Sequence, residues 1–290
     1  MKKIIIFIPV FNDWDSVKKL IVDLNNIIEK TEGILFECCI INDGSTAEQP
    51  NIKKPKNINS LRVFNMLKNK GHARCNAFAL KYAIQNEKFD YIILMDGDGE
   101  DRPIEIIDLV NQLKKTPNYS VVAKRIKRSE GPIFRFLYFM HKIITLIFTG
   151  KKINFGNYSC LTRKDVETIS SKASLWNSYS GTVKKYIDDY QEINSVRGIR
   201  YFGPSKMSLI SLMIHSFSII AVFKYHVFLR SIFIILLLIY LISYIGIFSI
   251  IAQLILVLFN LVILMISFRE SKLELFSSGD NLKNIKEITH

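Results

Sequence analysis

The chain has 290 residues, of which 49% are hydrophobic, and a formal net charge of +13 at pH 7. This length allows one large domain or two small ones. A charge of this size suits either nucleic acid or an anionic lipid surface. The stretch Ser231 to Phe268 decides between them, because its roughly forty uncharged residues are about twice one bilayer crossing. We therefore expect a membrane partner and no nucleic acid.

The first half of the chain alternates between two hydrophobic patterns. Short apolar runs predict strands at residues 4–10, 35–41, 61–66, 91–95 and 120–123. Apolar residues at helical spacing predict helices between these strands, with Ile104, Ile107, Val110 and Leu113 facing inward in the third helix. This alternation predicts a mostly parallel sheet covered by helices on both faces. The four cysteines have no metal-ligand spacing and are expected to be core thiols.

The strand predicted at residues 91–95 ends abruptly in acidic residues. Alternation along an extended segment would place Asp96, Asp98 and Glu100 on one side. Carboxylate oxygens in such a set suit Mg²⁺ or Mn²⁺, and the metal in turn suits a diphosphate. Asp101 followed by Pro103 predicts a helix start with Asp101 as N-cap. A solvated acidic turn is the simpler interpretation for an isolated Asp-x-Asp pair.

Three further polar loops follow predicted strands, at residues 9–13, 42–45 and 68–72. Ligands of open α/β sheets bind where the carboxyl ends of the strands meet. Oxygens of Asn12, Asp13 and Asp43 can accept hydrogen bonds from a base or ribose, and Lys68 and Lys70 can face phosphates. No Walker-type or dinucleotide-type glycine loop is present in the sequence, which argues against a P-loop NTPase or a dinucleotide enzyme.

The second half of the chain carries the membrane signals. Residues 131–150 combine a narrow polar stripe with many aromatic and aliphatic residues, which predicts an interfacial helix; a helix buried beneath the domain is an equally weighted alternative. Met207 to Phe223 predicts a juxtamembrane helix. The uncharged run predicts two transmembrane helices with a turn near Ser243 to Ser249, rather than a buried hairpin of a soluble protein. Residues 282–288 predict a short helix in the tail.

Basic residues at the flanks of the uncharged run predict its orientation in the membrane. These residues are Lys224, Arg230, Arg269 and Lys272. Lys and Arg are enriched in cytoplasmic flanks, so both ends of the hairpin are expected on the cytoplasmic side.

Four motifs in order resemble those of glycosyltransferase family 2. They are Ile8-Pro9-Val10-Phe11-Asn12-Asp13, Asn42-Asp43-Gly44-Ser45, Lys68-Asn69-Lys70-Gly71-His72 and Asp96-Gly97-Asp98-Gly99-Glu100-Asp101. The most similar branch contains the dolichol-phosphate mannose synthases and the bacterial polyprenyl-phosphate glycosyltransferases. Residues 200–207 and the two C-terminal spans also resemble that branch, so the resemblance covers about residues 1–268.

The resemblance implies an α/β architecture with a Rossmann-like, mostly parallel GT-A catalytic domain at residues 1–205, which includes the interfacial helix. A juxtamembrane amphipathic helix at 206–225, a two-helix transmembrane hairpin at 226–268 and a cytoplasmic tail at 269–290 would follow. The protein would lie in the inner membrane with its catalytic domain and both termini in the cytoplasm. Self-association into a homo-oligomer is also expected.

The resemblance further implies inverting transfer of a sugar from a nucleotide diphosphate sugar to polyprenyl phosphate or another lipid-linked acceptor. Carried over by position, the nucleotide-site residues are Pro9, Phe11, Asn12, Asp13, Asp43 and Asp96. Lys70, which can face phosphates, is expected at the same site. Asp98 and Glu100 would hold Mg²⁺ or Mn²⁺, with Asp98 essential for catalysis. Arg125, Arg128 and Arg135 would contact the acceptor phosphate.

The sequence departs from the family pattern at several positions. Asn42 and Glu100 replace a usual aspartate and glutamine, while Asn157 and Ser159 replace an aspartate and an arginine. Asn157 stands where a catalytic aspartate is expected, and an amide cannot take a proton. A phosphate monoester with a second pKa of about 6 is already largely ionised and needs no base. Asn157 is therefore compatible with a lipid-phosphate acceptor.

Two alternatives stay open. A hydroxyl of a lipid-linked saccharide would need a proton acceptor, for which Asp101, Asp188 and Asp189 are the nearest carboxylates in the sequence. A non-catalytic membrane scaffold would keep the fold and bind nucleotide without transferring sugar. The replacement at position 157 supports the scaffold weakly, whereas the intact acidic cluster argues against it.

Overall fold

The computed structural model describes residues 1–127, 132–204 and 208–289. Within them, one eight-stranded sheet has the order β7-β5-β6-β4-β1-β2-β3-β8. The strands are β1 (Lys2–Val10), β2 (Ile34–Asn42), β3 (Ser60–Met66), β4 (Tyr91–Leu94), β5 (Ser120–Lys127), β6 (Phe155–Thr162), β7 (Tyr190–Val196) and β8 (Leu282–Ile288). The helices of the sheet-bearing part are α1 (Trp14–Ile28), α2 (His72–Asn86), α3 (Ile106–Lys115), α5 (Arg163–Ser170) and α6 (Tyr179–Tyr186), with 3₁₀ turns η1 (Pro103–Glu105) and η2 (Ala173–Trp176).

The sheet is mixed but mostly parallel, as the alternation of elements predicts. β1 pairs in parallel with β2 and β4, and β2 pairs in parallel with β3. β5 and β7 form another parallel pair, while β6 runs antiparallel to both β4 and β5. The carboxyl ends of β1, β2, β3 and β4 therefore meet along one edge of the sheet.

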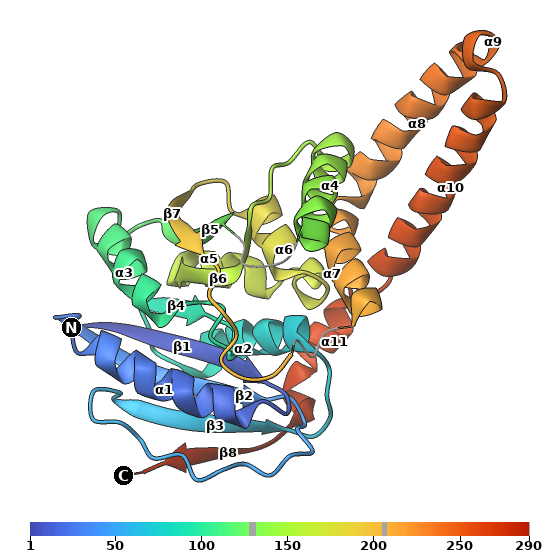
Figure 1. The fold of residues 1–290 in the computed structure, drawn as a ribbon. Coiled ribbons are helices and arrows are strands. Elements are labelled where there is room, and N and C mark those ends of the chain that lie inside the picture. Colours follow the sequence, from blue (N-terminus) through green and yellow to red (C-terminus); the bar gives the residue numbers. More distant parts are fainter. Residues whose placement is uncertain (128–131, 205–207, 290) are drawn as a thin grey trace.

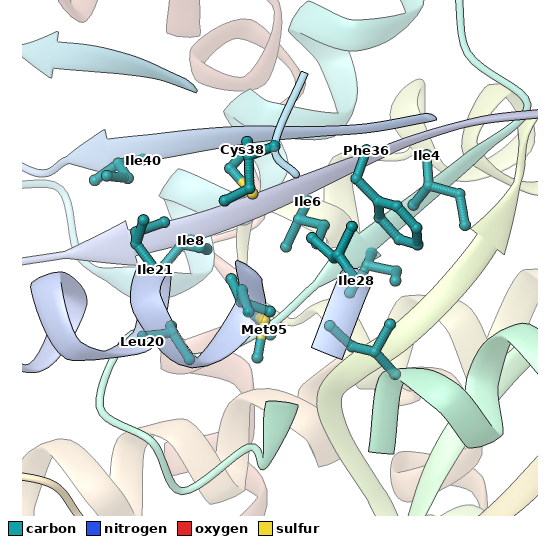
Figure 2. Close-up of a cluster of buried hydrophobic side chains, with 14 of the residues drawn as sticks. Ile4, Ile6, Ile8, Leu20, Ile21, Ile28, Phe36, Cys38, Ile40 and Met95 are labelled. Carbon is teal, nitrogen blue, oxygen red and sulfur yellow. The ribbon is translucent and has the colours of Figure 1, made fainter. Parts of the chain in front are cut away.

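Helices cover both faces of the central strands. Ile4, Ile6 and Ile8 of β1 pack with residues of α1 and β2 in one hydrophobic cluster (Figure 2). Ile5 and Phe7 point to the opposite face and join a second cluster that includes α2. All five side chains are fully buried, which explains why β1 is a continuous apolar run rather than an alternating one.

The acidic strand end differs from the prediction in how its helix starts. Asp101 is not an N-cap: η1 begins at Pro103 with Arg102 as its N-cap residue, and no side chain caps it. The 3₁₀ turn shifts the phase of the following helix, so Ile104 is 45% exposed rather than inward. The residues that α3 buries are Ile106, Leu109, Val110 and Leu113.

The C-terminal residues complete the sheet. The predicted short helix at residues 282–288 is wrong, because β8 pairs antiparallel with β3. α11 (Lys272–Phe276) and η3 (Ser278–Asn281) lead the chain back from its apolar helices to this edge. The apolar segment therefore leaves the sheet after one edge strand, β7, and returns to the other, β8.

The helices between β7 and β8 extend from the sheet. They are α7 (Leu209–Ala221), α8 (Lys224–Tyr240), α9 (Ile242–Ile245) and α10 (Ile247–Ser267). Figure 1 shows α8 and α10 running side by side away from the sheet, joined at their far end by α9. By length and composition, the described residues hold one helical run that is able to cross a membrane, Ile247–Phe276. α7 and α8 meet the same criteria only together, with an 86° bend between them.

α4 (Pro132–Thr149) lies beside this pair (Figure 1) and corresponds to the predicted interfacial helix. Its C-terminal end is joined to α8 because Arg230 Nη1 donates to the Ile147 carbonyl at 2.7 Å. The four cysteines are buried free thiols, which confirms their prediction as core residues.

Candidate active site

The candidate site lies at the carboxyl ends of β1, β2, β3 and β4, where the four predicted loops meet. The acidic turn after β4 folds back on itself: Asp101 Oδ2 accepts from the Asp96 amide at 2.9 Å, and Asp98 Oδ1 accepts from the Glu100 amide at 3.0 Å. The turn therefore points its carboxylates in different directions instead of alternating along an extended strand. Asp96, Asp98 and Glu100 each have a different partner.

A segment from the distant end of the domain crosses this acidic turn. Arg200 pairs with Asp13 and also with Asp98, whose Oδ2 lies 2.8 Å from Nη1. Arg197 pairs with Glu100. We call residues 197–201 the crossing segment; its backbone also donates to the turn, from the Gly198 amide to the Glu100 carbonyl at 2.8 Å.

Tyr201 fixes the end of the crossing segment. Its amide donates to the Asp98 carbonyl at 2.9 Å, and its hydroxyl donates to Asp23 of α1 at 2.7 Å. Its ring packs on Gly99, where an added Cβ would lie 2.6 Å from the ring and where φ is +86°. Only glycine combines this backbone conformation with so close a contact.

Asp98 is electrostatically crowded. Burial and the charges of Asp96 and Glu100 raise the pKa of Asp98 to about 6, although Arg200 acts in the opposite direction. Oxygen ligands of this kind suit Mg²⁺ or Mn²⁺, and a cation would relieve the repulsion between Asp98 and Glu100. Among the described residues, no group of three His, Cys, Asp or Glu side chains is arranged around one ion position. Asp98 and Glu100 thus fit a divalent cation only if a ligand supplies further oxygens and the two arginines move aside.

Asp96 has a partner of its own. Its Oδ1 lies 2.8 Å from His72 Nε2, at the first residue of α2. Burial opposes a charge on His72, but Asp96 outweighs it and the pKa of His72 is raised. Burial likewise opposes ionisation of Asp96, but His72 and nearby arginines hold the pKa of Asp96 well below its usual value. Asp96 and His72 thus lie within ion-pair distance, and each favours the charged form of the other.

Asn157 joins this pair from β6. Its Nδ2 lies 3.3 Å from His72 Nδ1 and 3.5 Å from Asp96 Oδ1. Ser159, at the other position that departs from the family pattern, is fully buried and donates to the Asn157 carbonyl at 2.9 Å. The structure thus brings Asn157 next to Asp96 and His72, and the sequence assigns no role to His72.

Asp43 and Asn12 organise the loops. Asp43 is 3% exposed, and its two carboxylate oxygens accept from the amides of Lys70 and Gly71 at 2.9 and 2.8 Å. Asn12 adopts a positive φ, and its Oδ1 accepts from the amides of Thr46 and Ala47, both at 2.9 Å. These side chains thus shape the loops in this structure, and their proposed contact with a nucleotide stays a prediction.

The other predicted nucleotide-site residues differ in exposure. Pro9 is buried within β1, whereas Phe11 is 40% exposed at its carboxyl end. Lys70 is exposed on the loop before α2. Neither Pro9 nor Asp43 presents a freely exposed side chain.

The predicted acceptor arginines are placed as follows. Arg125 lies near the end of β5, where its charge acts on Asp96 and Asp101. Arg128 falls outside the described residues. Arg135 belongs to α4, but its side chain is not described.

None of the three carboxylates expected to serve as an alternative base is well placed. Asp101 is 4% exposed and is bonded to the Asp96 amide. Asp188 and Asp189 are exposed residues that precede β7. Since β7 runs parallel to β5, they lie at the opposite edge of the sheet from Arg125.

The sequence reasoning missed Arg197, Arg200 and His72 as site residues. Their positions follow from contacts between segments far apart in the chain, which no local pattern reports. The available signal was charge: the acidic turn needs basic partners if it is to be partly buried. Arg200 begins the segment that resembles the family, but the resemblance implies no role for it.

Fold and site together define an α/β protein with an acidic turn at the carboxyl edge of its mostly parallel sheet. The family model described as Glycosyl transferase family 2 matches residues 5–173. This match covers more than half of the chain, which therefore belongs to glycosyltransferase family 2.

Curated relatives match the chain at 26 to 28% identity. The undecaprenyl-phosphate 4-deoxy-4-formamido-L-arabinose transferase of Klebsiella pneumoniae is 26% identical over 221 residues, which cover 73% of this chain and 65% of the relative. The Salmonella typhimurium transferase of the same name is 28% identical over 168 residues, covering 56% of this chain and 48% of the relative. An uncharacterised Methanocaldococcus jannaschii protein is 28% identical over 166 residues, covering 54% and 68%. The chain thus spans between about half and two thirds of these relatives.

Solved structures show the same fold at low identity. Glucosyl-3-phosphoglycerate synthase of Mycobacterium tuberculosis, in complex with Mn²⁺, UDP-glucose and phosphoglyceric acid, matches with a TM-score of 0.54 at 14% identity, covering 78% of this chain and 80% of that one. Mannosyl-3-phosphoglycerate synthase of Rubrobacter xylanophilus matches with a TM-score of 0.55 at 13% identity, covering 76% and 72%. The chain therefore has the GT-A fold of these enzymes.

Proposed function

We propose that this glycosyltransferase moves a sugar from a nucleotide diphosphate sugar to a polyprenyl phosphate at the cytoplasmic face of the inner membrane. The observation that carries the proposal is the acidic turn of Asp98 and Glu100, at the edge of the sheet where Arg125 and Asn157 also lie. The curated relatives named for undecaprenyl phosphate support this acceptor, and the structural relative in complex with UDP-glucose supports this donor class.

The membrane arrangement belongs to the same proposal. α8 and α10 would cross the bilayer as a hairpin, with α4 and α7 at its surface and both termini in the cytoplasm. Three observations support it: the apolar run Ile247–Phe276 is mostly exposed, the basic flanks remain at the domain end, and the chain re-enters the sheet through β8. Self-association remains a prediction from the resemblance.

The transfer step needs little from the protein besides positioning and charge. An oxygen of the acceptor phosphate attacks the anomeric carbon, a new C–O bond forms, and the bond to the diphosphate breaks with its electron pair, inverting the centre. Asp98 and Glu100 would hold Mg²⁺ or Mn²⁺, which neutralises charge on the departing diphosphate when bound. Because the phosphate is already ionised, Asn157 need not accept a proton.

A hydroxyl acceptor is less well supported. It requires proton removal, and the three carboxylates expected for that task are enclosed or lie at the wrong edge of the sheet. The scaffold alternative also loses support, because family members and structural relatives are transferases and the acidic turn is intact.

The proposal is tested with purified full-length protein, Mn²⁺ or Mg²⁺ and a panel of UDP- and GDP-sugars, with and without polyprenyl phosphate. Labelled sugar should move into an organic-extractable product that mild acid releases. Asp98→Ala should abolish this transfer while the protein stays folded, and Asp108→Ala, at an exposed acid of α3, should not. Transfer by a well-folded Asp98→Ala variant would contradict the proposal, as would product formed only with a hydroxyl acceptor.

A further inference from the structure

The tail that returns from the apolar helices reaches the loop that follows β3. After α10 the chain passes through α11 and η3 and then pairs, as β8, with β3 (Figure 1). Because the two strands are antiparallel, the start of β8 lies beside Met66, at the carboxyl end of β3. The tail therefore meets residues 67–71 at the same edge of the sheet as the candidate site.

Asn281, the last residue of η3, holds this loop through three hydrogen bonds. Its Oδ1 accepts from the Lys68 amide at 3.1 Å, and its Nδ2 donates to the Lys68 carbonyl at 2.9 Å. Its own carbonyl accepts from the Leu67 amide at 2.7 Å. The Asn281 side chain thus satisfies both backbone groups of Lys68, as the backbone of a neighbouring strand would.

Three asparagine side chains connect the same tail to the loop that follows β2. Asn42 ends β2, Asn65 lies opposite it in β3, and Asn284 lies opposite Asn65 in β8. Asn42 Nδ2 donates to Asn65 Oδ1 at 2.9 Å, and Asn65 Nδ2 donates to Asn284 Oδ1 at 2.8 Å. We call these three residues the asparagine ladder.

The Ser45 amide fixes the direction of the asparagine ladder. It donates to Asn42 Oδ1 at 3.0 Å, and a backbone amide can only donate. The Asn42 Nδ2 must then face Asn65, so Asn284 serves as an acceptor. An amide at position 42, where the family usually has an aspartate, supplies the proton that the bond to Asn65 needs.

The two loops that the tail holds are also joined to each other. Asp43 accepts from the amides of Lys70 and Gly71 at 2.9 and 2.8 Å. A Cβ added to Gly44 would lie 2.7 Å from the Asn69 nitrogen, so the backbones of the loops are in close contact there. A shift of either loop must therefore disturb the other.

We propose that Asn281 and Asn284 are positioning residues of the donor site, through which the C-terminal tail sets the affinity for the nucleoside diphosphate. This inference rests on the proposed function, because it takes Asp43 and Lys70 to belong to the donor site. The two asparagines act through the loops and do not touch the nucleotide. Loops that are already held in place lose less conformational freedom when the nucleotide binds, so binding is tighter.

The test is equilibrium binding of UDP and of GDP, as separate probes with Mn²⁺, to the purified full-length protein in detergent. The wild type should bind at least one of them. Asn281→Ala should weaken that binding by about fivefold or more, because it removes both side-chain hydrogen bonds to Lys68. Lys283→Ala, at an exposed residue between the two asparagines, is the matched control and should bind like the wild type.

Conservative variants distinguish positioning from a general loss of packing. Asn284→Asp should bind like the wild type, because a carboxylate still accepts from Asn65, whereas Asn284→Leu should weaken binding by about threefold. Asn281→Asp should be as weak as Asn281→Ala, since its second oxygen cannot donate to the Lys68 carbonyl.

Transfer kinetics supply a further readout that a merely stabilising tail would not give. In Asn281→Ala the KM for the sugar nucleotide should rise as binding weakens, while kcat and the KM for polyprenyl phosphate should change less than about twofold. Equal rises in both KM values would reject the positioning role, because they would indicate damage to the whole domain.

Unchanged nucleotide affinity in a folded Asn281→Ala variant would overturn the proposal and leave the proposed function intact. An equal loss of affinity in Lys283→Ala would also overturn it. Nucleotide binding that depends on Asn281, without sugar transfer to any acceptor, would reject the proposed function and leave the positioning role standing. Failure of the wild type to bind either nucleotide would overturn both.

Discussion

Arg200 Nη1 lies 2.8 Å from Asp98 Oδ2, and the same guanidinium pairs with Asp13, so one side chain joins the crossing segment to two loops of the site. All three side chains are about 15% exposed, which places these charges largely out of water. Removing one partner of a buried pair leaves the other charge uncompensated.

We therefore expect Arg200→Gln to lower the free energy of unfolding by on the order of 1–3 kcal/mol at pH 8. The cost should shrink at pH 5, because the Asp98 carboxyl, whose pKa is raised to about 6, is then protonated. Thermal unfolding in detergent at both pH values measures this. Arg163→Gln, at an exposed ion pair with Glu167, is the control and should change stability by less than about 0.5 kcal/mol. If Arg200→Gln lowered the free energy of unfolding equally at pH 8 and pH 5, the pair with Asp98 would not be the cause.

Asp101 should make the fold less stable as the pH rises. Burial and the charge of Asp96 raise the pKa of Asp101 to about 7, above its value of 3.8 in the absence of such effects. Between these two values the folded protein binds more protons than the unfolded chain, so stability falls as pH increases. Asp101→Asn should stabilise the protein at pH 8 by on the order of 2 kcal/mol and give no gain at pH 4.

The same unfolding measurement compares Asp101→Asn with Asp108→Asn, whose carboxylate is exposed. The exposed variant should show no comparable pH dependence. If Asp101→Asn stabilised the protein equally at both pH values, the gain would not come from the charge of Asp101.

Gly99→Ala should release the crossing segment. The new Cβ would meet the Tyr201 ring at 2.6 Å, and φ at this position is +86°. The Tyr201 ring must move to make room for this Cβ. Because Tyr201 holds the end of the crossing segment, the contacts of residues 197–201 with the acidic turn should weaken. Limited trypsin digestion should then cleave faster after Arg197 and Arg200, by about tenfold.

The Gly203→Ala variant distinguishes the effect of backbone strain from the effect of the contact with Tyr201. Its φ of +64° imposes a similar backbone cost, but no atom lies within 4 Å of an added Cβ. We expect a smaller increase in cleavage for this variant. Equal rates for both would assign the effect to backbone strain rather than to the contact with Tyr201.

The returning strand β8 should contribute to stability through its buried end. Ile288 is 6% exposed and packs in the same cluster as Ile4 and Leu61. Ile288→Ala should lower the free energy of unfolding by about 2 kcal/mol or more. Ile285→Ala, at a position that is 38% exposed in the same strand, should cost clearly less. Chemical or thermal unfolding of the two variants measures these changes. Equal losses of unfolding free energy would indicate that β8 does not pack against the sheet in solution.

The local pattern of apolar and polar residues was sufficient to predict most strands of the fold. The five predicted strands appear as β1 to β5, because apolar runs of this length bounded by polar loops leave few other ways to bury their side chains. The same reasoning failed for Ile104 and for residues 282–288. A 3₁₀ turn shifted the helical phase in one case, and in the other the backbone groups of β3 determined which conformation a short polar segment adopts.

Three features can be recognised without the structure: carboxylates gather at the end of a buried strand, Asn157 replaces a family aspartate, and a long apolar segment follows the domain. These features are encoded in neighbouring residues. Three others appear only in the folded chain: Arg200 and Arg197 pair with the acidic turn, Asp96 lies beside His72, and the C-terminal residues form an edge strand of the sheet. The physical reason is that buried charges and strand edges must find partners wherever the folded chain brings them, and such pairing leaves no periodic trace in the sequence.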